Sequence, residues 1–316
     1  MYTRNRSHLF ERALGSIVSA CHPVSTHVEI TVSDGSDDDR TGRIVERLLA
    51  GWPGGYRYVW NTPPLDMVNN MNRAIELASG EWIQQLGDDD FLLPTAGQVM
   101  VDAIRKAGQD RPIMLFGVHI VDLDGVVRRQ QTFRGTRHLA PREALRQLLG
   151  NSSFVREPGV LVRRSVYERE GLFDKRVGNP ADIDMWVRLF SRYGVTCMPY
   201  STCAYTIHEG ALTTGMWNPE TICTFDEIFD RAVASGVVPE HRVRRWQADF
   251  FHQFILAGAY RHLEKGRRAE AREVLKLFDL PAVRRRGLSP RWLPVRIAFV
   301  AATAGSRLSL RFLTHA

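Results

Sequence analysis

The stretch 80–94 constrains the fold more than any other part of the sequence. Its apolar run, 82–86, is typical of a buried strand, and a glycine ends it. Three carboxylates follow at once, Asp88, Asp89 and Asp90. Because the side chains of a strand alternate between its two faces, three consecutive aspartates cannot all reach solvent from within a strand. We therefore expect them just beyond the strand's carboxyl end, where open α/β sheets bind ligands.

Two interpretations of the three aspartates are open at this point. Adjacent negative charges repel one another, and a divalent cation held by carboxylate oxygens would relieve that repulsion. Alternatively, the aspartates cap the helix that is expected to begin near Thr95, since aspartate is favoured at helix N-termini. The local sequence does not separate these interpretations, so the rest of the chain has to decide.

Helix and strand patterns alternate along roughly the first two thirds of the chain, which is typical of an α/β fold with a mixed, mostly parallel sheet flanked by helices. Such a sheet normally opens with a strand. The six residues before the first expected helix are too few and too polar, so the first strand is expected to be missing. The helices are expected at 7–18, 41–50, 65–78, 95–107, 141–149, 165–170 and 180–190, and the strands at 28–32, 56–60, 82–86, 113–121, 126–133, 158–164, 195–198 and 204–207.

The pattern changes to helix alone after Pro219, with apolar stripes at 220–234, 242–264 and 267–278. We therefore expect a domain boundary near Asn218. The expected organisation is an α/β domain at 1–218, a helical extension at 219–280 and a basic amphipathic tail at 281–316.

The net charge of +7 comes from this tail, because residues 280–316 hold seven arginines and no Asp, Glu or Lys. The other 35 basic residues match the 35 acidic ones, so the body of the chain does not have the charge of a nucleic-acid-binding protein. Arginines beside Trp292 and Phe299 suit a helix that lies on anionic lipid. A helix packed on the domain with solvated arginines is the alternative.

The cysteines and the N-terminal residues bear on location. Four cysteines without zinc spacing in a chain of 316 residues indicate reduced thiols rather than a disulfide framework. The polar start 1–12 does not have the pattern of a signal peptide, and no apolar run reaches the roughly 18 residues that a membrane-spanning helix requires. The expected location is cytoplasmic, possibly at the inner face of the membrane.

Four segments, in order along the chain, resemble family 2 glycosyltransferases of the GT-A type. The segment SGEWIQQLGDDDFLLP resembles the family's metal-binding region, and VEITVSDGSDDDRT resembles its nucleotide-base turn. The segment NPADIDMWVRL resembles the start of its catalytic helix, and PGVLVRRSVYEREGLFD the part that precedes it. The resemblance extends from about Thr3 to Gly215, and the ordered set of four is more specific than any one of them.

The resemblance implies a donor site for a nucleotide-diphosphate sugar. Asp34 would accept a hydrogen bond from the base, and Asp88 would face the ribose or the water shell of the metal. Thr3 and Arg163 are the other expected donor-binding residues. Alternatively, Asp34 closes a turn and Arg163 lies at an exposed strand end.

The resemblance also implies a metal site and a catalytic base. Asp89 would ligate Mn²⁺ or Mg²⁺, with Asp90 and His208 as further expected ligands. Asp182 would remove the proton from the acceptor hydroxyl. The alternatives are that Asp90 caps the following helix, that His208 is structural, as a lone histidine more often is, and that Asp182 is a charge at a helix N-terminus.

The chemistry of the expected reaction suits these residue types. A leaving nucleoside diphosphate needs its charge neutralised, and an ion held by one or two carboxylates and by phosphate oxygens does so. An aspartate with a pKa near its ordinary value of about 3.9 is ionised at neutral pH and can accept a proton. In-line attack opposite the leaving group would invert the anomeric centre.

Two departures from the family pattern are present. Ala181 replaces the usual Glu beside Asp182, and the family's first strand is absent, with only the end of its turn matched by residues 3–6. The hypothesis for the second departure is that the natural start lies upstream or that the chain was truncated.

The resulting prediction is an inverting, metal-dependent glycosyltransferase. It would transfer sugar to a glycan or lipid-linked acceptor in surface polysaccharide biosynthesis. One alternative is a degenerate protein that keeps the fold and binds a nucleotide or carbohydrate without catalysis. A sugar-phosphate nucleotidylyltransferase is less favoured, because the chain start carries neither the Gly-rich, Arg-containing phosphate loop nor the Lys that such enzymes need.

Overall fold

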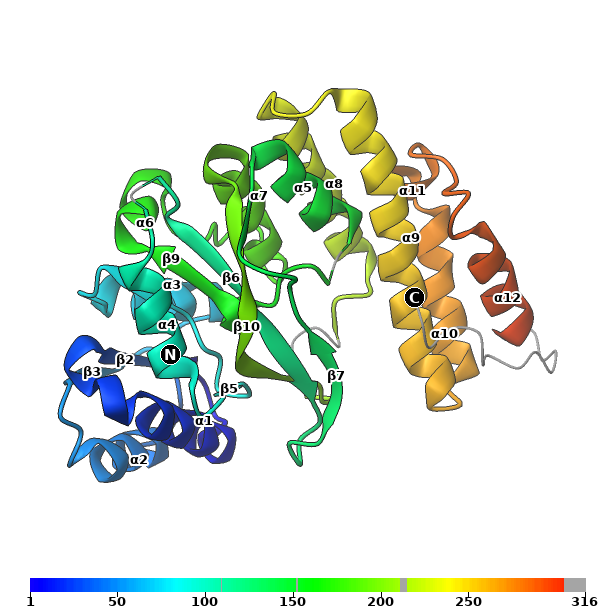
Figure 1. Ribbon diagram of the computed structural model, residues 1–316. Helices are drawn as coiled ribbons and strands as arrows, with labels where there is room; N and C mark the ends of the chain where they lie inside the picture. Colours follow the sequence, from blue (N-terminus) through cyan, green and yellow to red (C-terminus); the bar gives the residue numbers. More distant parts are fainter. Residues whose placement is uncertain (109, 152, 211–214, 304–316) are drawn as a thin grey trace. The chain divides into compact units, whose positions relative to one another are not determined.

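The computed structural model describes residues 1–108, 110–151, 153–210 and 215–303. The chain forms two compact units (Figure 1). The first consists of Met1–Ala144 and Val155–Ala211, and the second of Leu145–Phe154 and Leu212–Ala316. The sequence predicted a linear boundary near Asn218, whereas this division also assigns the internal segment 145–154 to the helical unit.

The first unit contains both strands and helices, as the alternating sequence pattern predicts. Its strands are β1 (Tyr2–Thr3), β2 (Glu29–Asp34), β3 (Gly55–Trp60), β4 (Trp82–Gln84), β5 (Phe91–Leu92), β6 (Ile113–Val121), β7 (Val127–Gln131), β8 (Arg137–Leu139), β9 (Val160–Arg163) and β10 (Val195–Thr206). Its helices are α1 (Ser7–Cys21), α2 (Arg40–Leu49), α3 (Met67–Leu77), α4 (Ala96–Arg105), α6 (Arg164–Glu170) and α7 (Ala181–Tyr193), with short 3-10 turns η1 (His22–His27) and η2 (Glu157–Gly159); α5 (Pro141–Gly150) continues into the segment 145–154.

The strands form a mixed arrangement, as expected, but antiparallel pairs outnumber parallel ones among the described strands. β1, β2 and β3 are parallel neighbours. Beyond them lies the order β4-β9-β6-β10-β5, in which β6 and β10 are parallel and the other neighbours antiparallel. A single parallel bridge, between Tyr2 and Gly87, links the two groups of strands. The parallel pattern that the sequence predicts therefore holds mainly for the first strands of the chain.

The first strand, which was expected to be missing, is present as two residues. Tyr2 pairs with Ser33 and Thr3 with Asp34, so β1 lies beside the carboxyl-terminal end of β2. Both residue types suit a strand, but two positions are too few for a period to be recognised in the sequence.

One long strand replaces two expected short ones at 195–207. β10 continues through Pro199 and Tyr200, and its register against β6 shifts between Cys197 and Ser201 and again between Ser201 and Cys203. These irregularities accommodate Pro199, which has no backbone N–H to donate to a neighbouring strand. The sequence of this irregular part contains a proline and polar residues, so it resembles a break between two strands.

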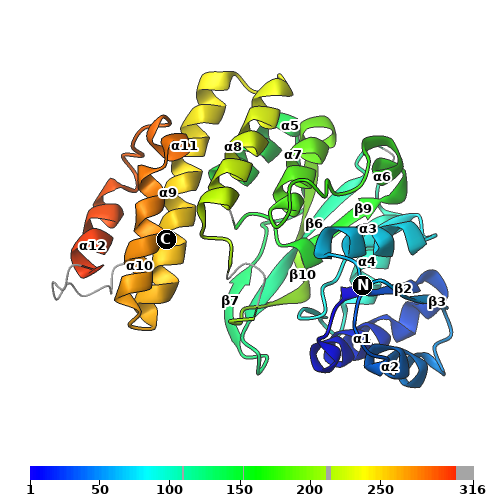
Figure 2. The ribbon, with the colours of Figure 1, turned by 180° about the vertical axis from the view of Figure 1, so that it is seen from behind.

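Helices cover both faces of β2. The hydroxyl of Thr31 donates to the carbonyl of Ala74 in α3, whereas Ile30 and Val32 belong to the core that α1, α2 and α4 cover. Figures 1 and 2 show α1 and α2 on one side of β2 and β3 and α3 on the other. This layering holds the carboxyl-terminal ends of β1 and β2 in a fixed position.

The second unit is helical, as expected after Pro219. Its core contains fully buried aromatic residues, among them Phe225 and Phe250, whose ring centroids lie 4.9 Å apart. Trp217, a possible sugar-stacking residue by sequence, instead donates its indole N–H to the carbonyl of Phe254 within this unit. The helices are α8 (Pro219–Ala234), α9 (Glu240–Glu264), α10 (Arg268–Leu275), α11 (Pro281–Arg284) and α12 (Leu293–Thr303), with the 3-10 turn η4 (Lys276–Asp279).

The described part of the basic tail is folded onto these helices. Arg285 and Arg286 form ion pairs with Asp226 of α8, and the Arg296 guanidinium lies 4.0 Å from the ring centroid of Phe278. These arginines are therefore not simply solvated. Arg307 and Arg311 lie outside the described residues. Among the helices described, none combines the length and apolar character needed to cross a membrane.

Candidate active site

The carboxyl-terminal ends of the parallel strands β1 and β2 and of β4 meet at one edge of the first unit. Thr3 lies beside Asp34 by strand pairing, and the bridge between Tyr2 and Gly87 brings the loop after β4 to the same place. Asp88, directly after this bridge, is bound by Thr3, whose hydroxyl donates to its Oδ2 at 2.8 Å. Three segments that are distant in sequence therefore place polar side chains together.

Asp34 is fully buried at the end of β2. Its Oδ1 accepts the Ser36 amide at 2.8 Å, and its Oδ2 accepts the Tyr58 hydroxyl at 2.9 Å. Burial, together with Asp34, raises the pKa of Tyr58, so this hydroxyl stays a donor at neutral pH. Next to this turn, the indole of Trp60 donates to the Ser36 carbonyl at 2.7 Å and remains 41% exposed. The turn after β2 is therefore fixed by hydrogen bonds, and the exposed ring of Trp60 lies beside it.

Asp88 is a buried carboxylate with two bound partners. Besides Thr3, Arg6 reaches it, with Nη1 3.3 Å from Oδ1. Burial and the neighbouring Asp89 raise its pKa to about 6, while Thr3 and Arg6 oppose this rise. Asp88 is therefore held in one orientation by residues that precede the first helix.

The carboxylate of Asp89 faces both Arg6 and His208. Its side chain is 21% exposed, and its Oδ2 lies 3.3 Å from Arg6 Nη1 and 3.1 Å from His208 Nε2. Arg6 also donates to the carbonyl of Gly210. The segment after β10 is thus tied to the loop after β4, and an aspartate and a histidine come together there.

The carboxyl group of Asp90 faces strand β10 and not Arg6 or His208. It is buried, and its Oδ1 accepts the backbone amide of Thr206 in β10 at 2.8 Å. Burial and the charge of Asp89 raise its pKa well above the usual range. The three aspartates do not cap α4, whose N-cap residue is Thr95. Each has instead a different partner.

Asp182 lies in the first turn of α7. Its Oδ1 accepts the backbone amide of Ile183 at 2.7 Å, and burial raises its pKa to about 6 although Arg156 lowers it. Its neighbour on the same turn, Asp184, is fully buried and pairs with Arg188. The two aspartates of this helix start therefore occupy different environments, because Asp184 is fully buried in an ion pair whereas Asp182 is only partly buried.

Comparison with known proteins identifies the fold and the family. Residues 1–171, more than half of the chain, match the sequence profile described as Glycosyl transferase family 2. The chain belongs to glycosyl transferase family 2.

Two solved glycosyltransferase structures have a fold similar to that of this chain. S. aureus TarS 1–349 in complex with UDP-GlcNAc matches with a TM-score of 0.64 and 14% identity over 96% of this chain and 86% of that one. The mannosyltransferase PcManGT from Pyrobaculum calidifontis, solved with GDP-Man and Mn²⁺, matches with a TM-score of 0.56 and 19% identity over 96% of this chain and 84% of that one. The expected GT-A fold is confirmed.

A sequence relative is found in Mycobacterium tuberculosis (strain CDC 1551 / Oshkosh), the uncharacterized protein MT1568. It is 28% identical over 207 residues, which is 62% of either chain. The longer TarS structure is likewise matched over 52% of its length. The family 2 chain therefore spans about half to two thirds of these relatives.

One expected donor residue of this family 2 chain lies apart from the others. Arg163 pairs across the sheet with Trp82, at the beginning of β4, whereas Asp88 follows the end of that strand. Its guanidinium forms an ion pair with Glu81 and lies 4.8 Å from the centroid of the Trp82 ring. Because β4 and β9 are antiparallel, the basic end of β9 is at the edge opposite the carboxylates.

The same antiparallel pairing brings in a residue that the sequence interpretation missed. Glu157 lies just before β9 and so reaches the carboxylate edge, where Tyr2 donates to its Oε2 at 3.0 Å. Its Oε1 is buried without a hydrogen-bond partner. Burial, and next the charge of Asp182, raise its pKa to about 8, with a further contribution from Asp89. The signal available in the sequence was a carboxylate placed directly before a strand.

The side chains at this edge include possible ligands for a divalent ion. Within the described ranges, no group of three or more His, Cys, Asp or Glu side chains could hold a metal by itself. Asp89 and His208 are in contact, and both are suitable ligands for Mn²⁺. Two protein ligands fit an ion that completes its coordination with substrate phosphates, as Mg²⁺ commonly does.

Proposed function

We propose that this chain is an inverting glycosyltransferase that transfers a sugar from a nucleotide-diphosphate sugar to a hydroxyl group. The carrying observation is the polar cluster after β1, β2 and β4, in which Thr3 binds Asp88 and His208 meets Asp89. Besides burial, the charges of Asp182 and Asp89 both raise the pKa of Glu157, which supports a position of the expected base near this cluster. Asp34, Asp88 and Thr3 lie at the same edge. Family membership and solved relatives with UDP-GlcNAc and GDP-Man support the donor class.

In this proposal the donor occupies the edge formed by β1, β2 and β4. The base lies against the turn after Asp34, with Trp60 beside it as an exposed aromatic surface. The diphosphate lies near Asp89 and His208. A divalent ion held by this pair and the diphosphate would neutralise the leaving group's charge.

Asp182 takes the proton from the acceptor hydroxyl in the proposed reaction. With a pKa of about 6 it is ionised at neutral pH, yet it is a stronger base than an ordinary aspartate. The hydroxyl oxygen attacks the anomeric carbon from the side opposite the leaving diphosphate, which inverts that centre. Asp90 has a structural role, because its carboxyl group holds the Thr206 amide of β10.

The acceptor is proposed to be a glycan or lipid-linked hydroxyl in surface polysaccharide assembly. The second unit supports a peripheral membrane contact by one observation. In α12, Ile297 and Val300 are 62% and 51% exposed on a helix otherwise packed on its own unit. We expect flotation with anionic liposomes to be lost in an Ile297→Asp, Val300→Asp double variant; equal flotation of variant and wild type contradicts the contact.

The decisive test of the function is donor turnover with Mn²⁺. Asp182→Asn is expected to lower kcat by about 10²- to 10⁴-fold and leave donor binding intact, because only the proton acceptor is removed. The wild-type rate should fall below pH 6, where the base is protonated. Asp89→Asn should instead abolish the Mn²⁺-dependent thermal shift by the donor.

A matched control is Asp110→Asn, whose side chain is 80% exposed. It should behave as wild type in both assays. Unchanged turnover in Asp182→Asn contradicts the assignment of the base. Donor binding without any turnover in the wild-type chain supports the alternative of a binding protein that retains the fold.

A further inference from the structure

Arg156 lies directly before Glu157 and is half-buried. Its guanidinium covers the ring of Tyr205 in β10, 4.7 Å from the ring centroid. The Nε atom is buried without a hydrogen-bond partner, and no aspartate or glutamate of the described ranges forms an ion pair with this side chain. Withdrawing a cation from water without a counter-charge is unfavourable, which makes Arg156 a candidate for binding an anionic ligand.

Two other arginines near the carboxylate edge are, by contrast, bound to oxygen atoms of the fold. Arg6 pairs with Asp89, and Arg12 donates to the Asp89 carbonyl at 2.8 Å. Each of them therefore connects separate segments of the chain. The guanidinium of Arg156 has no such bond within the described residues, and its N–H groups form a planar fork that matches a carboxylate or a phosphate.

The charge of Arg156 reaches the expected base. Burial raises the pKa of Asp182 to about 6, and the charge of Arg156 is among the effects that lower it. The Asp182 carboxylate accepts the Ile183 amide and forms no ion pair with Arg156. An anion bound by Arg156 would therefore lie beside the hydroxyl that loses its proton.

A second arginine stands on the same face of the sheet as Tyr205. Tyr205 pairs with Ile120 in β6, and Ile120 pairs with Arg129 in β7, so the three side chains form one row. Arg129 is exposed and has no ion pair within the described ranges, whereas its neighbour Arg128 is paired with Asp122. Two cations without counter-charges on one face favour the approach of an anion.

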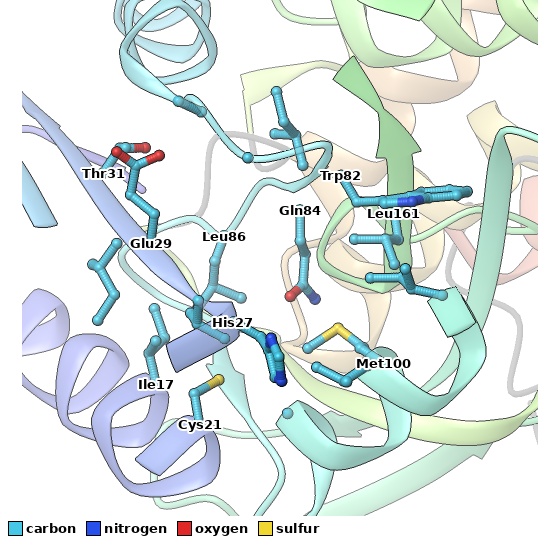
Figure 3. Close-up of a pocket in the computed structure, with 18 of the residues that line it drawn as sticks. Ile17, Cys21, His27, Glu29, Thr31, Trp82, Gln84, Leu86, Met100 and Leu161 are labelled. Atoms are coloured by element: carbon cyan, nitrogen blue, oxygen red, sulfur yellow. The ribbon is translucent and has the colours of Figure 1, made fainter. Parts of the chain in front are cut away.

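The cavity between β2 and β4 offers no comparable cation among the residues described. Figure 3 shows apolar side chains around it, among them Ile17 and Met100. The arginine in its lining, Arg105, lies 3.6 Å from Asp102 and has a side chain that is 59% exposed. Arg156 is not part of this lining. An anionic group is therefore expected at Arg156 and not in the cavity.

We propose that Arg156, supported by the Tyr205 ring, binds an anionic group of the acceptor, either a carboxylate or a phosphate, beside the hydroxyl that Asp182 deprotonates. The diphosphate of the donor is assigned to Asp89 and His208 in the proposed function, so Arg156 recognises the acceptor. An uncharged acceptor would leave the cation without a counter-charge. This inference rests on the proposed function, because that function places the acceptor beside Asp182.

The test measures the binding of three methyl glycosides to the full chain by NMR titration. Methyl β-glucoside, methyl β-glucuronide and methyl β-glucoside 6-phosphate differ only at C6, which carries a hydroxyl, a carboxylate or a phosphate. At least one anionic probe is expected to bind at least about 10-fold more tightly than the glucoside, because hydrogen bonds to charged groups are the stronger ones. The tighter of the two identifies the group. Added salt should weaken only the binding of the anionic probes.

Three variants locate the site. Arg156→Gln is expected to abolish the preference for the anionic probes and to leave the affinity for the glucoside unchanged. Arg47→Gln is the matched control, because it removes the same charge from a side chain of α2 that is 57% exposed, and it should keep the preference. Asp182→Asn should bind the anionic probes more tightly than the wild type, since it removes a neighbouring negative charge. Unchanged affinity in Asp182→Asn overturns the place beside the base.

Equal binding of the three probes by the wild type, or an Arg156→Gln variant that keeps the preference, overturns the proposal. So does an Arg156→Gln variant that binds UDP with Mn²⁺ more weakly by the same factor, because Arg156 would then belong to the donor site. If Arg156→Gln does not fold, Arg156→Lys replaces it, since lysine keeps the charge but not the fork. Unchanged affinity of Arg156→Lys for the preferred probe then overturns the proposal.

Donor turnover is measured separately on the same preparations. Turnover without a preference for the anionic probes contradicts this inference alone. A preference that depends on Arg156, in a chain without turnover, contradicts the proposed function alone.

Discussion

Three consecutive aspartates have three different environments in this chain. Asp88 is buried against Thr3 and Arg6, Asp89 meets His208, and the Asp90 carboxyl group holds the β10 backbone. Identical side chains thus differ in their partners because the loop after β4 turns each toward another segment. The different roles proposed for the three aspartates rest on these neighbours.

Glu157 provides a prediction about stability and pH. Its folded pKa of about 8 exceeds its ordinary 4.5, so the folded state binds the proton more tightly than the unfolded state. The neutral form stabilises the fold below pH 4.5, and this contribution is lost as pH rises toward 8. Glu157→Gln keeps a neutral group of the same shape. Urea unfolding at several pH values should therefore show a smaller loss of stability over this window than in the wild type.

The comparison has a built-in control. Glu168→Gln changes an exposed glutamate of α6, with a side chain 54% exposed, and should leave the pH dependence unchanged. A wild-type and a Glu157→Gln curve that run parallel from pH 4.5 to 8 would show that Glu157 has no raised pKa.

The site residues could be predicted to the extent that they lie in local motifs. Asp34 ends β2 and Asp182 lies in the first turn of α7, while Asp88 and Asp89 lie between β4 and β5. Glu157 was missed because its position depends on which edge the antiparallel β9 begins from, and pairing partners are not encoded locally. Arg163 was placed with the donor residues for the same reason.

At the scale of elements, the close approach of α4 and α1 depends on a glycine. A Cβ on Gly97 would lie 2.6 Å from the carbonyl oxygen of Ala20 and 3.0 Å from the Cα of Cys21. Gly97→Ala should therefore destabilise the protein by about 1–3 kcal/mol through overpacking, as measured by urea unfolding.

A glycine of the partner helix is the matched control. Gly15 in α1 has nothing within 4 Å of its virtual Cβ. Gly15→Ala should stabilise the fold by about 0.5–1 kcal/mol, since alanine is favoured in helices. Equal effects of the two substitutions would mean that the α1–α4 contact is not tight.

Most of the helices and strands were predicted from periodicity, and the exceptions have a physical cause. The bulged middle of β10 has a polar, proline-containing sequence that locally resembles a loop. Its continuity comes from the neighbouring β6, a fully formed partner that a single sequence window does not contain. The two-residue strand β1 is likewise defined by its pairing with β2, which its own short sequence does not indicate.

At the scale of the whole molecule, arginines near the end of the chain form ion pairs within the second unit. The Arg286 and Asp226 side chains are 14% and 10% exposed, so their ion pair is mostly buried. Arg286→Ala should lower the free energy of unfolding by about 2 kcal/mol, because Asp226 loses a charged hydrogen-bond donor. Calorimetry of the full chain measures this as a lower midpoint.

Arg284 in α11 offers the comparison. Its side chain is exposed, so Arg284→Ala removes the same charge from the same turn with a change within about 0.5 kcal/mol. If both variants melt alike, the pair with Asp226 contributes little, and the arginines act through their net charge.

The ion pairs of Arg285 and Arg286 with Asp226 have a practical consequence for shortened versions of the protein. A truncation before Arg285 would remove both guanidinium groups and leave the mostly buried Asp226 carboxylate without its cationic partners. Melting temperatures measured on such a shortened chain therefore do not report the stability of the second unit in the full chain.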